Sequence, residues 1–251
     1  PDVRVPKVLP FCTARITAME RLDGTKATAT ESMSASDRHR LAARIVEALL
    51  AAPLFSPQPD AMFHADPHAG NLLATPSGDL GILDWALVGY LSQPVREQLA
   101  QMMLSAQLLD ARGVCQAIER LGEGSPAHPA RLRETVERSL ARRKFGNGTG
   151  FDCLTELLDV AALTCGFRFS ENLLLCRKTG LILQGVIADI SGEGSLEHLL
   201  FSSTVQQLSR EWPGRFLLPF ASRGLGSRLS NFDLLRASWM LPWASAARWR
   251  P

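Results

Sequence analysis

Two short apolar runs separated by a cluster of turn-forming residues place the strongest constraint on how this chain folds. The runs are residues 71–75 and 80–84, and the four residues between them read Pro-Ser-Gly-Asp. This pattern predicts a tight β-hairpin, because proline, glycine and aspartate favour the backbone angles of turns. Residues at the open end of a hairpin face one another across strands about 4.8 Å apart. We therefore expect Asn71 and Asp84 to converge on one point.

A further acidic side chain lies just before this hairpin. Asp66 precedes Asn71 by five positions, on a segment that Pro67 and Gly70 interrupt. The D-x-x-x-x-N spacing is that of a kinase catalytic loop, in which the aspartate meets the nucleophilic hydroxyl. Carboxylate and amide oxygens suit Mg²⁺, which usually takes one or two protein ligands together with phosphate and water. The segment therefore predicts magnesium-assisted phosphoryl transfer, with Asp66 beside the acceptor.

The eight contiguous residues that begin at His64 read His-Ala-Asp-Pro-His-Ala-Gly-Asn. They resemble the H-x-D-P-H-P-G-N catalytic loop of the UbiB/ADCK group of atypical kinases, also called aarF-domain proteins. The resemblance implies ATP and Mg²⁺ as ligands, with Asp66 as the catalytic aspartate. It also implies that Asn71 and Asp84 hold the metal on the nucleotide phosphates. His64 and His68 would then support the loop.

A second stretch of similarity precedes Gly24 and resembles the last strand of a kinase N-lobe as it enters the hinge. By this resemblance Met19 is the gatekeeper, while the Glu20 carbonyl and the Leu22 N–H bind the adenine edge of ATP. A later segment, 173–181, is similar to a late helix of the family. The resemblance thus extends over about the first 200 residues.

Three features depart from the family pattern. Ala69 stands in place of the second proline of the loop, which removes a fixed φ angle. Trp85 and Ala86 stand where Phe and Gly follow the metal-binding aspartate, and alanine visits positive φ less freely than glycine. The family's lysine strand, nucleotide loop and αC-like glutamate would lie before Pro1. We therefore expect a C-lobe with a remnant of the N-lobe.

Outside the hairpin, apolar residues recur at helical spacing, which predicts a mainly α fold, a protein-kinase-like C-lobe with one small catalytic hairpin. Ser34 and Asp37 form a capping pair at the first helix, and residues 25–36 read as a polar linker. Helices are expected over residues 34–50, 92–109, 110–122, 130–144, 152–164, 170–190, 195–211 and 230–247. The expected domains are an N-lobe remnant and hinge (1–24), a helical C-lobe (25–209) and a basic Trp-rich helical extension (210–251).

The amino-acid composition argues against a nucleic-acid-binding protein, a disulfide-rich or zinc-binding protein and a membrane-spanning protein. The chain is 46% hydrophobic, enough to bury a core, and its net charge of +2 gives no argument for nucleic-acid binding. Its five cysteines include no C-x-x-C pair, which argues against a disulfide framework or a zinc site. Most of the cysteines are expected to be buried thiols in a reducing compartment, so the expected location is cytoplasmic. No run of about 18 apolar residues occurs, so we expect no spanning helix.

The residues after position 209 differ from the rest of the chain. They hold four of the five tryptophans, and seven arginines stand against two acidic residues. A basic, Trp-rich segment is typical of a helix that lies on a membrane surface, so peripheral membrane contact through 210–251 is one expectation. The alternative is an ordinary helix packed on the C-lobe with its arginines in solvent.

The leading functional hypothesis is an atypical kinase or ATPase of the UbiB type. The resemblance links it to ubiquinone or other isoprenoid-lipid metabolism, with an isoprenoid lipid or quinone precursor as partner. The lysine strand is not visible and Trp85 replaces Phe, so a pseudokinase that binds nucleotide or a partner without chemistry stays open. An aminoglycoside-type phosphotransferase shares the same H-x-D, Asn and Asp pattern. The H-x-D-x-H run from His64 to His68 also fits a transition metal.

Overall fold

The computed structural model describes residues 3–143, 151–192 and 195–248. These ranges are mainly helical, as expected, and their short strands form three small sheets. The α-helices are α1 (Ala35–Val46), α2 (Ala52–Leu54), α3 (Gln93–Gln107), α4 (Ala111–Leu121), α5 (Leu132–Arg143), α6 (Phe151–Cys165), α7 (Glu171–Ser191), α8 (Leu196–Arg215) and α9 (Asn231–Arg248). Three other helical turns are the π-helical η1 (Glu47–Ala51) and the 3-10 turns η2 (Ala69–Asn71) and η3 (Pro129–Arg131).

The expected hairpin is present and forms the centre of a four-stranded sheet. The strands of the described ranges are β1 (Val3–Arg4), β2 (Thr25–Lys26), β3 (Asp60–His64), β4 (Leu72–Ala74), β5 (Leu80–Ile82), β6 (Val88–Ser92), β7 (Gly122–Glu123) and β8 (Arg168–Phe169). β4 and β5 pair antiparallel with Leu72 opposite Ile82, and the sheet order is β1-β5-β4-β2. The turn holds Gly78 at φ +80°, a conformation that glycine adopts without strain.

The prediction of a polar linker over residues 25–36 is wrong at its start. β2 pairs with β4, and the next residue, Ala27, is fully buried and donates its N–H to the Leu72 carbonyl at 2.9 Å. A Thr- and Ser-rich segment has little local preference for a strand. It becomes one here because β4 offers an unpaired edge, which is a contact between residues distant in sequence.

A second antiparallel pair was not expected. β3 and β6 align five residues each, from Asp60 opposite Ser92 to His64 opposite Val88. The expectation of a single hairpin is therefore wrong, and β7 pairs with β8 as a third short ribbon. Each of these strands has a distant partner, so its pairing could not be recognised from adjacent turn residues.

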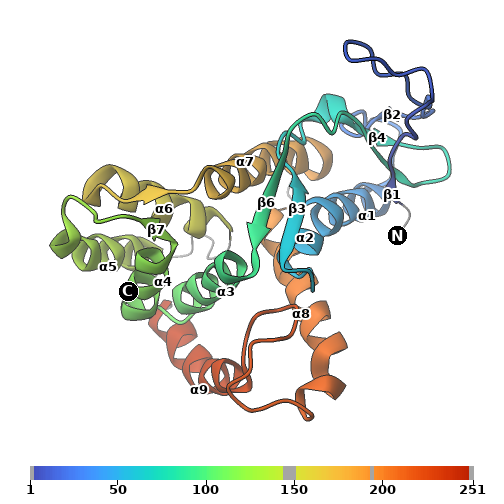
Figure 1. Ribbon diagram of the computed structural model, residues 1–251. Helices are drawn as coiled ribbons and strands as arrows, with labels where there is room; N and C mark the ends of the chain where they lie inside the picture. Colours follow the sequence, from blue (N-terminus) through green and yellow to red (C-terminus); the bar gives the residue numbers. More distant parts are fainter. Residues whose placement is uncertain (1–2, 144–150, 193–194, 249–251) are drawn as a thin grey trace.

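The helices enclose these ribbons. Figure 1 shows β3 and β6 running down the middle, with α3 to α6 on one side and α1 and the four-stranded sheet on the other. α7 crosses the top and packs on both α1 and β6. Buried residues of α1 such as Ile45 and of α7 such as Ile187 belong to one apolar cluster. Each fully buried side chain of this kind stabilises the fold by about 1.5–3 kcal/mol.

The helices that begin after Ser34 and Ser230 have side-chain caps, whereas Ser92 and Asp110 precede α3 and α4 without a cap hydrogen bond. The Ser34 hydroxyl accepts the Asp37 N–H at 3.1 Å, and Ser230 accepts the Asp233 N–H in the same way. The predicted stop of α8 before Pro213 is wrong, because the helix continues to Arg215. A proline in the last turn removes only its own N–H bond, so the remaining residues keep helical geometry.

The arginines after residue 209 are not all in solvent, contrary to the packed-helix expectation. Arg215 is 3% exposed and bonds Glu211 at 2.6 Å, and Arg228 donates to the Ser56 carbonyl at 2.7 Å. The tryptophans behave in the opposite way, since Trp239 and Trp243 are 73% and 77% exposed. None of the described helices is long and apolar enough to cross a membrane.

Candidate active site

Asp66 lies in the loop between β3 and η2, and its backbone is held by neighbouring residues of the motif. Its N–H donates to Nδ1 of His64 at 3.1 Å. Its carbonyl accepts from the Asn71 side-chain amide at 3.2 Å and from the His68 N–H at 2.8 Å. The Asp66 carboxylate takes part in none of these bonds, and 37% of the side chain is exposed. The loop therefore fixes the backbone and leaves the carboxylate available.

The Asp66 carboxylate pairs with a lysine from the other end of the sequence. Lys178 lies on α7, and its Nζ donates to Asp66 Oδ1 at 3.0 Å. This hydrogen bond and the ammonium charge hold the pKa of the Asp66 carboxyl below its usual value, although burial acts in the other direction. At neutral pH Asp66 is thus an ionised carboxylate with a fixed cation beside it.

His64 ties the loop to the hairpin. Its Nδ1 accepts the Asp66 N–H, so its proton lies on Nε2, which contacts the Leu83 carbonyl at 3.0 Å. The ring is 1% exposed and packs edge-on against Trp85, with ring centroids 4.9 Å apart. Both nitrogens are bonded inside the protein, which leaves none for a metal and argues against the transition-metal alternative. Trp85 is a packing residue here.

Asn71 and Asp84 lie at the open end of the hairpin. The expectation that they are directly opposite one another is wrong. The Leu83 N–H donates to the Asn71 carbonyl at 2.8 Å, so Leu83 is the partner of Asn71. Asp84 is one position further and has φ +50°. Its Oδ1 accepts the Ala86 N–H at 3.3 Å in a local turn. β5 ends at Ile82, and the left-handed backbone of Asp84 then changes the direction of the chain.

The free atoms of these two side chains are oxygens. The Asn71 amide nitrogen is used by the Asp66 carbonyl, so the amide oxygen is the group left over. In the described part of the chain, Oδ2 of Asp84 has no hydrogen-bond partner, and its side chain is exposed. Hard oxygens of this kind fit Mg²⁺. No group of three or more His, Cys, Asp or Glu that could hold a metal ion occurs among the described residues, so phosphate or water would complete the shell.

His68 has a smaller role in the loop than His64. Its Nδ1 accepts the Gly70 N–H at 3.1 Å and so caps η2, while the ring is exposed. A Cβ on Gly70 would lie 2.9 Å from the His68 ring, which explains a glycine at that position.

The expected gatekeeper, Met19, and the two residues expected at the adenine edge, Glu20 and Leu22, lie in different surroundings. Met19 bridges to Val8 and is 44% exposed, and the Glu20 N–H donates to the Lys7 carbonyl. Leu22 is half-buried and approaches β5, where a Cβ at Gly81 would lie 3.4 Å from its side chain. Leu22 is therefore the member of the three that lies against the catalytic hairpin.

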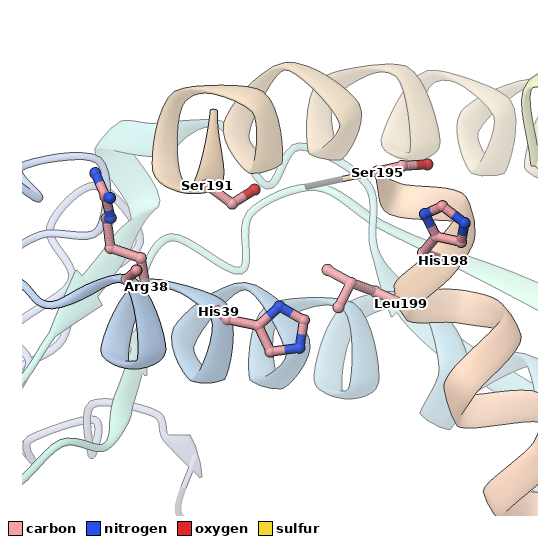
Figure 2. A pocket seen from close by; sticks show the side chains of 7 residues that line it. Arg38, His39, Ser191, Ser195, His198 and Leu199 are labelled. Atoms are coloured by element: carbon pink, nitrogen blue, oxygen red, sulfur yellow. The ribbon is translucent and has the colours of Figure 1, made fainter. Parts of the chain in front are cut away.

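A pocket of about 510 Å³ lies between the start of α1, the end of α7 and the start of α8. Figure 2 shows His39 and His198 on either side of Leu199, with Arg38 directed away from them. The lining residues include none of the predicted site residues, so this pocket is separate from the Asp66 loop.

Comparison with protein families covers the part of the chain that holds this loop. Residues 1–118 match the model of the ABC1 atypical kinase-like domain. This range contains Asp66, Asn71 and Asp84, and it ends within α4. The match covers a little under half of the chain, so similarity to ABC1 atypical kinase-like domains is shown for residues 1–118.

Similar sequences come from a cyanobacterium and a plant. The uncharacterised protein slr0889 of Synechocystis sp. is 36% identical over 84 residues, 33% of this chain and 21% of that protein. The chloroplastic protein ACTIVITY OF BC1 COMPLEX KINASE 7 of Arabidopsis thaliana is 30% identical over 117 residues, 45% of this chain and 16% of that protein. The chain thus matches about a fifth or less of the length of these relatives.

The ABC1 match ends before α7, so it does not contain Lys178. Sequence reasoning placed this lysine in a helix similar to the family's, but did not assign it to the site. A signal was present, because Lys178 is one of only four lysines and follows the apolar run 173–176. A cation among such residues either pairs inside the protein or serves a site, and only the fold reveals its partner.

Proposed function

We propose that this chain carries the catalytic part of an ATP-dependent atypical kinase or ATPase. ATP would be the phosphoryl donor, with Mg²⁺ on its phosphates. The coarser statement, an ABC1 atypical kinase-like domain, already follows from the match over residues 1–118. The finer assignment of Asp66, Asn71 and Asp84 to the chemistry is the proposal.

The observation that carries this proposal is one continuous set of hydrogen bonds among the motif residues. His64 contacts Asp66 through one ring nitrogen and the Leu83 carbonyl through the other, and Asn71 bonds both the Asp66 carbonyl and the Leu83 N–H. Asp84 follows Leu83 directly. The residues that carry a carboxylate, an amide oxygen and a second carboxylate therefore lie on one hydrogen-bonded stretch of backbone, which supports the positioning that phosphoryl transfer requires.

The residues would act as follows. Asn71 and Asp84 would hold Mg²⁺ through their free oxygens, and a bound magnesium ion neutralises phosphate charge. Asp66 would orient the acceptor hydroxyl or water. The γ-phosphorus gains a bond to the acceptor oxygen and loses its bond to the β–γ bridging oxygen, whose electron pair leaves with ADP. The acceptor proton passes to the Asp66 carboxylate or to solvent.

The test is magnesium-dependent ATP hydrolysis by the full-length protein and by its Asp84→Asn variant. We expect a wild-type rate that disappears without magnesium and falls at least about 100-fold in the variant, because a neutral amide is a poorer metal ligand. Asp79→Asn is the matched control, since Asp79 lies in the turn at the other end of the hairpin and bonds Ser77. Equal background rates in wild type and Asp84→Asn would exclude the enzyme and favour the pseudokinase.

The nucleotide would lie between the hairpin and the segment that holds Met19, Glu20 and Leu22. Leu22 supports this placement because it lies against β5. The acceptor would belong to isoprenoid-lipid or quinone metabolism, as in the UbiB group, and an aminoglycoside-type small molecule is the other acceptor class. Turnover measured with each class of acceptor would separate them.

We also propose a peripheral membrane contact through residues 210–251, in a protein otherwise located in the cytoplasm. Trp212, Trp239 and Trp243 are 59%, 73% and 77% exposed. Since Arg215 and Arg228 bond inside the protein, the contact would depend mainly on these aromatic side chains. Sedimentation with lipid vesicles at two salt concentrations tests it, and absence of binding at both would remove the contact.

A further inference from the structure

Lys178 and Asp66 both have bonding capacity that the protein does not use. Lys178 Nζ lies 3.0 Å from Asp66 Oδ1, and an ammonium group has three N–H donors. Within the described ranges, the other two donors have no partner, and neither does Oδ2 of Asp66. The two side chains are 48% and 37% exposed, so a ligand can reach them. The pair presents donors and an acceptor side by side.

The backbone beneath Lys178 is fixed to the strand that leads into the catalytic loop. The next residue, Thr179, is 1% exposed and donates its hydroxyl to the His64 carbonyl at 3.2 Å. About two turns earlier on α7, the Asn172 side chain accepts the Tyr90 N–H from β6. α7 is thus attached to both strands of the β3–β6 ribbon, and this attachment sets where the ammonium lies.

The simpler interpretation is a surface ion pair, which adds little to stability when it is this exposed. The same helix supplies a comparison. Arg177, adjacent to Lys178, pairs with Asp159 of α6 and not with the catalytic loop. Its side chain is 29% exposed, so it is at least as buried as Lys178. The two neighbouring cations of α7 therefore pair with different elements, Arg177 with α6 and Lys178 with the catalytic loop.

We propose that Lys178 is a catalytic residue of the phosphoryl-transfer site: it holds the Asp66 carboxylate beside the acceptor oxygen and donates its free N–H groups to the transferred phosphoryl group. This inference rests on the proposed function. As the γ-phosphorus exchanges the bridging oxygen of ADP for the acceptor oxygen, negative charge spreads over its equatorial oxygens. Lys178 stabilises that charge and keeps its own protons, and the acceptor proton passes to Asp66.

The first measurement is steady-state ATP turnover by the full-length protein with Lys178→Ala, Lys178→Arg and Arg177→Ala. For Lys178→Ala we expect kcat to fall about 100-fold and KM for ATP to stay within about threefold, since the contact strengthens only in the transition state. Lys178→Arg restores part of kcat because it keeps the charge. Arg177→Ala keeps the wild-type rate.

A second measurement needs no turnover. The melting temperature is recorded with Mg-ADP alone and then with Mg-ADP plus aluminium fluoride, which mimics the transferred phosphoryl group. We expect Lys178→Ala to keep the shift caused by Mg-ADP and to lose the further shift caused by aluminium fluoride. Arg177→Ala keeps both shifts.

Several outcomes would overturn this role. A wild-type kcat and a full aluminium fluoride shift in Lys178→Ala would show that the ammonium does not touch the phosphoryl group. Equal losses in Lys178→Ala and Arg177→Ala would show a structural effect of α7. Failure of the proposed function gives a different result, because wild type and Asp84→Asn would then hydrolyse ATP at the same background rate. That result would also exclude the catalytic role of Lys178.

Discussion

At the scale of single residues, His64 does more than its position in the motif indicates. Its ring satisfies the Asp66 N–H and contacts the Leu83 carbonyl, and it is 1% exposed. His68 looks equivalent in the sequence, yet it is exposed and, among the described residues, its ring accepts only the Gly70 N–H. The two histidines of the motif therefore differ in how many backbone groups depend on them.

This difference gives a prediction for stability. His64→Ala should lower the free energy of unfolding by about 2–4 kcal/mol, because it removes a buried ring and leaves two backbone groups without partners. His68→Ala should lower it by less than about 1 kcal/mol, since water can replace the single bond. Urea denaturation at neutral pH measures both, and equal losses would contradict the assignment of His64 as the residue that ties loop to hairpin.

At the scale of elements, α7 is the helix that completes the site. It brings Lys178 to Asp66 and places Gly180 directly on Phe151 of α6, where a Cβ would lie 1.7 Å from a ring carbon. A glycine in the middle of a helix normally weakens it. Here it leaves room for the Phe151 ring to pack directly against the backbone of α7.

Two glycines of α7 provide a matched pair of substitutions. Gly180→Ala should destabilise the protein by about 1–3 kcal/mol, because Phe151 must move to accommodate the methyl group. Gly185→Ala should stabilise it by about 0.5–1 kcal/mol, since no atom lies within 4 Å of the added Cβ and alanine favours the helix. Thermal unfolding of both variants checks the signs, and a gain of stability in Gly180→Ala would refute the close packing.

At the scale of the whole molecule, residues after α8 are bonded to α3 and to the loop before β3. Arg223 bonds Asp233 through two nitrogens, at 2.9 and 3.1 Å, and reaches Glu97 of α3 at 3.1 Å. Arg228, with φ +57°, donates to the Ser56 carbonyl in the loop before β3. Segments about 130 to 170 positions apart are joined by these bonds, so the extension is part of the fold.

Asp233 makes this connection dependent on pH. Burial alone would raise the pKa of its carboxyl, but Arg223 and Ser230 lower it below the usual value. A carboxyl with a lowered folded-state pKa stabilises the protein above its unfolded-state pKa, and this contribution disappears as the pH falls through the folded-state pKa. Asp233→Asn should therefore lower the free energy of unfolding by about 1.5–3 kcal/mol at pH 7, and by progressively less below about pH 4. Urea denaturation from pH 7 to pH 3 measures this, and a constant difference in the free energy of unfolding between variant and wild type would contradict it.

Much of the helical fold was predictable, and the reason is local. Local features predicted these helices, because a cap or an apolar repeat involves residues only a few positions apart. Examples are the Ser34 and Ser230 caps and the apolar spacing of α1. The hairpin was predictable because its turn residues lie between its strands. β2, β3 and β6 were missed because their partners come from distant segments. Asp84 lies one position beyond the partner of Asn71, because the pairing of Ala74 with Leu80 leaves five residues in the turn and not the four expected.

The sequence by itself determined the chemistry available near the hairpin, since residue types and spacing along one loop are local properties. His64, Asp66 and Asn71 had to lie close together because eight consecutive residues contain them all. Only the tertiary structure decided which cation meets the Asp66 carboxylate. Lys178 lies 112 positions away, and the packing of α7 on the β3–β6 ribbon selects it in place of the neighbouring Arg177. Side chains that far apart meet through helix packing, which no short stretch of sequence encodes.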